Sequence, residues 1–166
     1  MAATIQKVSL IILGLAAFTV QSAAYAAGLQ QCSSAPLQLG TKTIGRASYF
    51  AEDCQQLWNR QSIRVDFAYS HSIPDWAFKR AATHFLQRNL QNFSEKSELH
   101  RITQWYKAVK PGDLYSLSYQ QDQQRITLAL NRQILGSLQS AQANQYFLIW
   151  FGSKPFNVKL KQQLLN

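Results

Sequence analysis

The sequence is short of acidic residues, of sulfur and of long apolar runs. Only eight Asp and Glu residues stand against 17 Lys and Arg residues, so the formal net charge is +9 at neutral pH. Such a balance favours anionic partners or surfaces without naming one. The basic residues are scattered, however, and no nucleic-acid-binding motif accompanies them. A solvated basic surface explains the charge equally well, and we expect no nucleic-acid partner.

The longest apolar run covers Val8–Val20 and is shorter than the roughly 20 residues that a membrane-spanning helix needs. Lys7 precedes this run, and small residues follow it up to an A-x-A cleavage pattern that closes on Ala26. We therefore expect a signal peptide over residues 1–26, cut between Ala26 and Ala27, and a periplasmic or secreted mature chain. A retained N-terminal membrane anchor has much the same pattern and stays open as the alternative.

Cysteine is also scarce, since the chain has only Cys32 and Cys54, both after the expected cleavage point. Two cysteines in an oxidising compartment usually pair, and we expect a disulfide between them. The chain-entropy model gives such a bridge about 3 kcal/mol of stabilisation. Two free buried thiols are the alternative. No C-x-x-C motif is present and no histidine stands at ligand spacing from either cysteine, so we expect no metal site, no cofactor and no redox site.

Apolar and polar residues alternate over residues 42–50 and 62–69, the pattern of strands with one buried face. In the second segment, Ile63, Val65 and Phe67 fall on one face. Residues 27–42 are rich in Gln, Ser and Gly, and we interpret them as an irregular lead-in. The folded domain is then expected over residues 43–166.

Ser72-Ile73-Pro74-Asp75 is typical of a helix start, with the serine as cap and the aspartate completing a capping box. A second helix is expected over residues 94–108. The following patterns predict a hairpin of strands 114–119 and 125–130, a short segment 133–135, a helix over 138–151 that ends at Gly152, and a last helix capped by Asn157. This order predicts an α+β domain with a mainly antiparallel sheet covered by helices on one side.

Four segments of the C-terminal half follow one another in an order and spacing that occur in a known family. They are Lys110–Asp113, Leu130–Gly136, Ile149–Pro155 and Leu160–Leu165. The chain resembles the chalcone isomerase-like family on these segments, in its exported bacterial branch, and a weaker match begins at Ile63. The likeness covers roughly residues 43–166. It implies an open-faced β-sandwich, in which a large antiparallel sheet carries helices on one face and a ligand cleft lies against it.

The resemblance also bears on catalysis. The isomerases of the family hold a phenolate and polarise a ketone with an arginine, threonines, a tyrosine and an asparagine, a form of oxyanion stabilisation. Matched by spacing, Ile149 stands where the family has the threonine of the C-terminal helix. The other threonine falls near Ala47, and the arginine falls within Ala35-Pro36-Leu37, where there is none. Because isoleucine neither donates nor accepts a hydrogen bond, we expect no catalytic residues here.

Other residue types offer weaker signals. His71, His84 and His100 have no nucleophile beside them, and Glu95 and Glu98 suit the start of a helix better than an acid–base pair. The four tryptophans, at positions 58, 76, 105 and 150, fit either a packed core or the wall of an apolar cavity.

The fatty-acid-binding members of the wider family imply a function for the chain. On that resemblance we expect a non-catalytic, monomeric binding protein that holds a small amphiphilic or fatty-acid-like ligand between sheet and helices, without a cofactor. Two alternatives stay open. One is an interaction module of the cell envelope, whose basic surface meets a protein or an anionic lipid surface, and the other is an isomerase acting on an unknown substrate.

Overall fold

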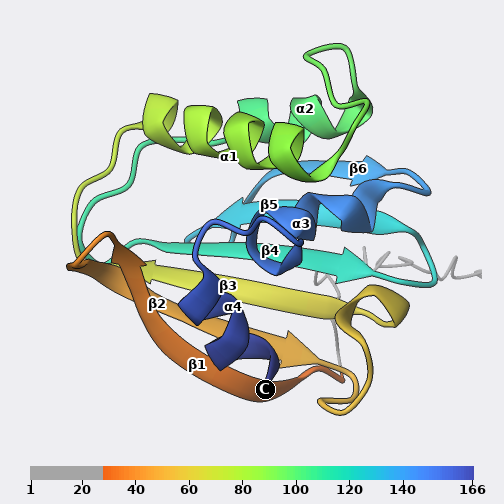
Figure 1. Ribbon diagram of the computed structural model, residues 1–166, viewed down its shortest axis with the longest axis horizontal. Coiled ribbons are helices and arrows are strands. Elements are labelled where there is room, and N and C mark those ends of the chain that lie inside the picture. The colour runs from red at the N-terminus through yellow and green to blue at the C-terminus, as the bar shows by residue number, and fades with distance from the viewer. Residues whose placement is uncertain (1–27) are drawn as a thin grey trace, which may run out of the picture.

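The computed structural model describes residues 28–166. The expected signal peptide, with Ala26 and Ala27 at its cleavage site, lies outside the described residues. The described chain forms one six-stranded antiparallel sheet in which every strand pairs with the next along the sequence, in the order β1-β2-β3-β4-β5-β6 (Figure 1). The expected α+β fold with a large antiparallel sheet is confirmed.

The elements have the following bounds. The strands are β1 (Gln30–Leu39), β2 (Lys42–Ala51), β3 (Ile63–Tyr69), β4 (Leu114–Gln120), β5 (Arg125–Leu130) and β6 (Gln133–Gln139). The helices are α1 (Asp75–Asn89), α2 (Glu98–Gln104), α3 (Leu148–Phe151) and α4 (Val158–Leu165), with 3-10 helices η1 (Trp58–Arg60) and η2 (Ala143–Phe147).

Alternation along β3 shows why the two faces of the sheet differ. Val65 is fully buried and lies in register between Tyr49 and Leu117, which are also buried. The next position, Asp66, points to the opposite face between Ser48 and Ser116, and all three are only half-buried. One face is therefore apolar and the other is polar, as expected for a sheet that is covered on one side.

The helices complete a single core on the apolar face. Buried leucines of α1, α2 and α4 (Leu86, Leu99, Leu160 and Leu164) belong to the same hydrophobic cluster as the inward residues of the strands. Helix α4 packs on β1 and β2, whereas α1 packs against α2 and α3, as Figure 1 shows. The expected coverage of one face by helices is confirmed.

The structure corrects the expectation of an irregular lead-in over residues 27–42, because Gln30–Leu39 within this range form strand β1. Ala35 and Leu37 point into the core, and Pro36 between them is exposed. β1 is an edge strand, where a proline and several polar side chains are tolerated because one side of the strand has no partner in the sheet. The folded unit therefore starts before residue 43.

Two helix predictions were too long. The helix expected over 94–108 covers only Glu98–Gln104, and the one expected over 138–151 is replaced by the end of β6, a 3-10 helix and the four-residue α3. Ser72 does not cap α1. The N-cap is Pro74, because Ile73 forms an isolated antiparallel bridge with Val109 that keeps this segment extended.

Other local predictions are confirmed. The two strands of the predicted hairpin are β4 and β5. Gly152 is the C-cap of α3, and the Oδ1 atom of Asn157 accepts a hydrogen bond from the backbone N–H of Leu160 at 2.9 Å, which caps α4.

Candidate ligand-binding cavity

A cavity of about 140 Å³ lies between α1 and one end of the sheet. Its sheet side is built from the end of β1, the start of β2 and the end of β3, with Leu37, Ile44 and Phe67 in the wall. Ala77, Ala81 and Ala82 of α1 face it from the other side. Larger side chains of the same helix, including Leu86, pack in the core. The alanines are too short to fill the gap, and space remains beneath them.

Polar atoms are few in this wall and none of them carries a charge. Among the lining residues, only Tyr69, Tyr106 and Trp150 have a polar side-chain atom. Burial raises the pKa of Tyr69 above its ordinary value, and the nearby Tyr115 raises it further. Burial also raises the pKa of Tyr106, with a further contribution from Tyr146. Both phenols therefore stay protonated and neutral across the physiological pH range.

An aromatic cluster holds these phenols in place. The ring of Phe78 stacks on Tyr106 with centroids 5.3 Å apart and meets Tyr69 and Tyr115 edge-on at 5.4 Å. The Tyr115 hydroxyl donates to the carbonyl of Lys107 at 2.8 Å and accepts from its N–H at 2.7 Å. Burial raises the pKa of Tyr115 to about 12. This pair of hydrogen bonds fixes the segment after α2 and, with it, the position of Tyr106.

The positions that spacing matches to the family's catalytic residues are apolar in the structure. Ile149, the predicted equivalent of the threonine, is 3% exposed and lies in the cavity wall. Ala47 and Ala35 are buried in the core next to each other, on β2 and β1. None of these three side chains can itself polarise a ketone.

The tryptophans differ in whether they line the cavity or pack in the core, the two roles that the sequence left open. Trp150 lines the cavity and packs on Phe67 with ring centroids 4.9 Å apart. Trp58 and Trp105 pack against the core, whereas Trp76 is 61% exposed. Sequence patterns did not identify Tyr69, Tyr106 or the α1 alanines as wall residues. The available signal was the run of small residues on one side of the helix after Pro74.

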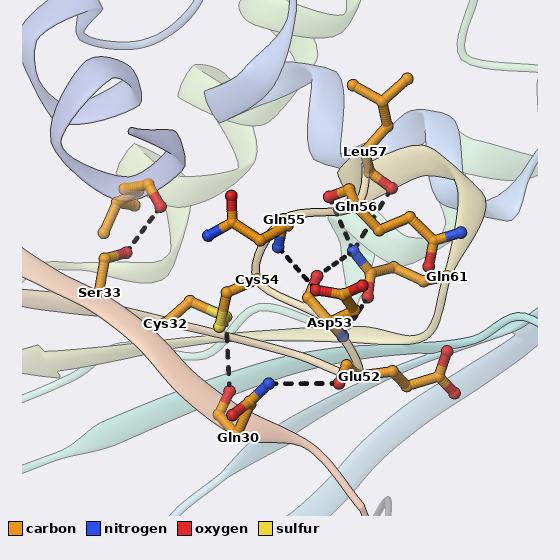
Figure 2. Close-up of a disulfide and its surroundings, with 11 residues drawn as sticks. Gln30, Cys32, Ser33, Glu52, Asp53, Cys54, Gln55, Gln56, Leu57 and Gln61 are labelled. Carbon is orange, nitrogen blue, oxygen red and sulfur yellow. Dashed lines mark hydrogen bonds between the residues drawn. A yellow bond between two sulfur atoms is a disulfide. The ribbon is translucent and has the colours of Figure 1, made fainter.

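The predicted disulfide joins Cys32 to Cys54 at the other end of the sheet (Figure 2). The S–S distance is 2.04 Å and the Cα atoms are 5.4 Å apart, which is ordinary geometry for the bond. Beside it, the side chain of Gln61 is buried inside the loop between β2 and β3. Its Oε1 accepts from the N–H of Asp53 at 2.8 Å, and its Nε2 donates to the carbonyls of Asp53 and Gln56.

The histidines lie outside the cavity. His84 and His100 line a polar groove between α1 and α2, and the His71 ring is 3.0 Å from the Ser70 hydroxyl. Glu98 is in the first turn of α2, as predicted, whereas Glu95 precedes that helix and lines the groove. Within residues 28–166, no three His, Cys, Asp or Glu side chains gather in a way that could hold a metal ion.

The residues that carry the family resemblance build a turn. Asp113 accepts from the N–H of Lys110 at 2.8 Å and from the side chain of Asn131, also at 2.8 Å. Asn131 in turn accepts from the N–H of Leu114 at 2.9 Å. The hydrogen bond from Asn131 is the main reason why the pKa of Asp113 lies below its ordinary value. Two motifs 18 residues apart thus lock the start of β4 to the end of β5.

Comparisons with known proteins agree with this architecture. Residues 49–166 match the family model described as chalcone isomerase-like. Among solved structures, the fold is similar to that of a fatty-acid binding protein of Arabidopsis thaliana, with a TM-score of 0.63 and 13% sequence identity over 84% of this chain and 87% of that chain. A search of curated proteins found no match. No helix of residues 28–166 has the length and hydropathy required to cross a membrane.

Proposed function

Because the chain belongs to the chalcone isomerase-like family, we propose that it is a non-catalytic binding protein that holds a small apolar or amphiphilic molecule between its sheet and its helices. The observation that carries the proposal is the apolar cavity of about 140 Å³ between α1 and β1–β3. Concave, mostly apolar sites with a few polar groups are typical of small-molecule binding. The Arabidopsis protein of similar fold is a fatty-acid binding protein, which supports the same assignment.

The cavity itself argues against the isomerase alternative. Ring closure on a chalcone requires a cation for the phenolate and hydroxyl donors for the ketone. Ile149 occupies the wall where a threonine would stand, and no lining residue is cationic. We therefore expect no turnover of naringenin chalcone above its spontaneous cyclisation.

We further propose that the protein is exported, with residues 1–26 removed after Ala26. The Cys32–Cys54 disulfide supports a location outside the cytosol, because such bonds persist in oxidising compartments and are rare in the cytosol. The intact mass of the protein purified from the cell envelope fraction tests this step. A chain that begins at Ala27 is expected, and a chain that still carries residues 1–26 would indicate the retained anchor instead.

The envelope-interaction alternative makes a different prediction. If the basic surface is the functional one, binding to vesicles that contain an anionic lipid should weaken as salt is added. One concave surface with basic residues is the groove that holds Lys79, Arg80 and the two histidines of α1 and α2.

Binding of fluorobenzene, followed by fluorine NMR, tests the proposed function. This probe is uncharged and close to the size of the cavity. The wild-type protein is expected to bind it saturably, and Ala81→Leu, which fills the cavity from α1, is expected to lower the affinity at least tenfold. Ala141→Leu adds the same side chain at an exposed position and should bind as the wild type does. Absence of saturable binding, or equal binding by Ala81→Leu, would overturn the proposal.

A further inference from the structure

The size of the cavity restricts what it can hold. Its volume of about 140 Å³ is close to that of an engineered apolar cavity of about 150 Å³ that takes up one benzene molecule. A single aromatic ring or a chain of a few carbon atoms fits such a space. A long acyl chain does not, unless α1 moves away from the sheet.

The charge distribution restricts the ligand further. Among residues 28–166, no Lys or Arg lines this cavity. Three basic groups on neighbouring elements are engaged elsewhere. On α1, Lys79 donates to Asp75 at 2.7 Å; on α4, Lys161 donates to the carbonyl of Gly152 at 2.8 Å; and on β3, Arg64 pairs with Asp66 on the opposite face of the sheet. An ionised carboxylate held in the enclosed part of this wall would therefore lack a basic partner, which is strongly unfavourable away from water.

Three lining residues, Tyr69, Tyr106 and Trp150, have a side-chain group that can donate a hydrogen bond to a neutral oxygen. Two other buried phenols are already engaged, since Tyr115 bonds to Lys107, and Tyr146 lies 3.3 Å from the Thr103 hydroxyl and also hydrogen-bonds with Tyr106. Because burial keeps the wall phenols protonated, they donate hydrogen bonds and do not attract a cation.

Building on the proposed function, we propose that the cavity selects a small uncharged molecule, of about the size of one aromatic ring, whose single oxygen accepts a hydrogen bond from Tyr69 or Tyr106, and that it rejects ionised carboxylates. This preference separates the chain from a fatty-acid carrier. The same fold would then hold a neutral alcohol, phenol or ketone in place of an acid.

Calorimetric titration of the purified, exported protein with benzyl alcohol and with benzoate at pH 7 tests the preference, since the two probes share one ring. Benzyl alcohol is expected to bind at least 100-fold more tightly. As the pH is lowered from 7 to 5, the apparent affinity for benzoate should rise about tenfold per unit, because only the neutral acid enters, while that for benzyl alcohol should stay constant.

Conservative variants test the role of the phenols. Tyr69→Phe and Tyr106→Phe keep the shape of the wall, and at least one of them is expected to lower benzyl alcohol affinity about fivefold, the loss of one hydrogen bond. Fluorobenzene affinity should not change in either variant, which also shows that the variant is folded. Tyr119→Phe, at a buried phenol outside the wall, is the matched control and should leave both affinities unchanged.

The outcomes separate this inference from the proposed function. If benzoate binds at pH 7 as tightly as benzyl alcohol, or if neither phenylalanine variant weakens benzyl alcohol binding, the selectivity for a neutral oxygen is wrong although the cavity still binds ligands. If fluorobenzene binds and benzyl alcohol does not, the inference is also wrong. If none of the three probes binds, the proposed function itself fails and the inference with it.

Discussion

The two ends of the sheet are packed in opposite ways. At the end where β1 starts and β2 finishes, a disulfide joins Cys32 to Cys54 and the loop closes around the buried Gln61. Large rings fill this end, since Trp58 lies 5.5 Å from Phe151 and Phe151 lies 5.6 Å from Tyr49 between ring centroids. At the end where β1 finishes and β2 starts, the alanines of α1 leave an open space.

The difference shows how one small domain can keep an unfilled cavity. A void next to core side chains lowers stability, because the atoms that line it lose contacts. A covalent bond and a loop that is hydrogen-bonded around the buried Gln61 side chain at the other end offset that loss. We therefore expect changes at the disulfide end to alter stability and not binding, and changes at the cavity end to alter binding more than stability.

The largest expected effect is complete unfolding at high pH. Burial raises the pKa of Tyr49, at the disulfide end, and of Tyr115, behind the cavity, to about 12. Because these folded-state pKa values exceed the unfolded value of about 10, the stability that the neutral phenols contribute is complete below pH 10 and is lost as the pH rises towards 12. Tyrosinate absorbance and circular dichroism should change together.

This titration also sharpens the comparison between the two ends. If a tyrosine of residues 28–166 ionises near pH 10 while the fold is intact, water reaches one of the buried rings. If this ionisation step is absent in Tyr69→Phe, the water is in the cavity, and the two ends of the sheet differ more than their packing suggests.

The second effect is the loss of the disulfide. Replacing both Cys32 and Cys54 with alanine is expected to lower the free energy of unfolding by about 3 kcal/mol, since the bridge closes a loop with a sequence separation of 22. Denaturant unfolding measures the change. Fluorobenzene affinity of the folded protein should stay within twofold of the wild type, and a larger drop would show that the two ends are coupled.

A third, smaller effect is expected at the loop beside the disulfide. Gln61→Leu removes the partner of the Asp53 N–H and one hydrogen bond to each of two partly buried carbonyls, and should lower the free energy of unfolding by about 2 kcal/mol. Gln55→Leu, at an exposed position in the same loop, is the control and should change stability little. Equal effects of the two variants would contradict the assigned role of Gln61.

The smallest effect is expected at the turn between β5 and β6, which lies at the cavity end of the sheet. Asn131 and Arg132 both have positive φ, 51° and 71°, as a two-residue turn of this kind requires. Arg132→Gly should relieve the strain and raise the free energy of unfolding by less than about 1 kcal/mol. Arg132→Ala keeps the strain and should give no gain. If both variants raise the free energy of unfolding, the arginine side chain and not the backbone conformation is the source of the destabilisation.

Local patterns predicted those parts of the fold in which a residue and its immediate neighbours determine the outcome. The alternation over residues 62–69 placed Val65 and Phe67 in the core, and Asn157 caps the last helix because the cap needs only a side chain and the next turn. The segment Lys110–Asp113 predicted a turn. The hydrogen bond that Asp113 accepts from Asn131, however, joins two segments that no local sequence pattern connects. The extent of the two middle helices was misjudged, because β6 and the Ile73–Val109 bridge compete for their ends.

The sequence by itself determined a strongly basic charge and a single pair of cysteines, and it predicted an α+β fold and, from the family resemblance, an isoleucine in the family's threonine position. Tertiary structure decided that residues 30–39 form an edge strand, that the disulfide and the cavity lie at opposite ends of the sheet, and that Tyr69 and Tyr106 meet in one wall. The physical reason is that a cavity is a space left by several elements at once. Alanines on one helix become a binding surface only when the sheet opposite them is held at a distance.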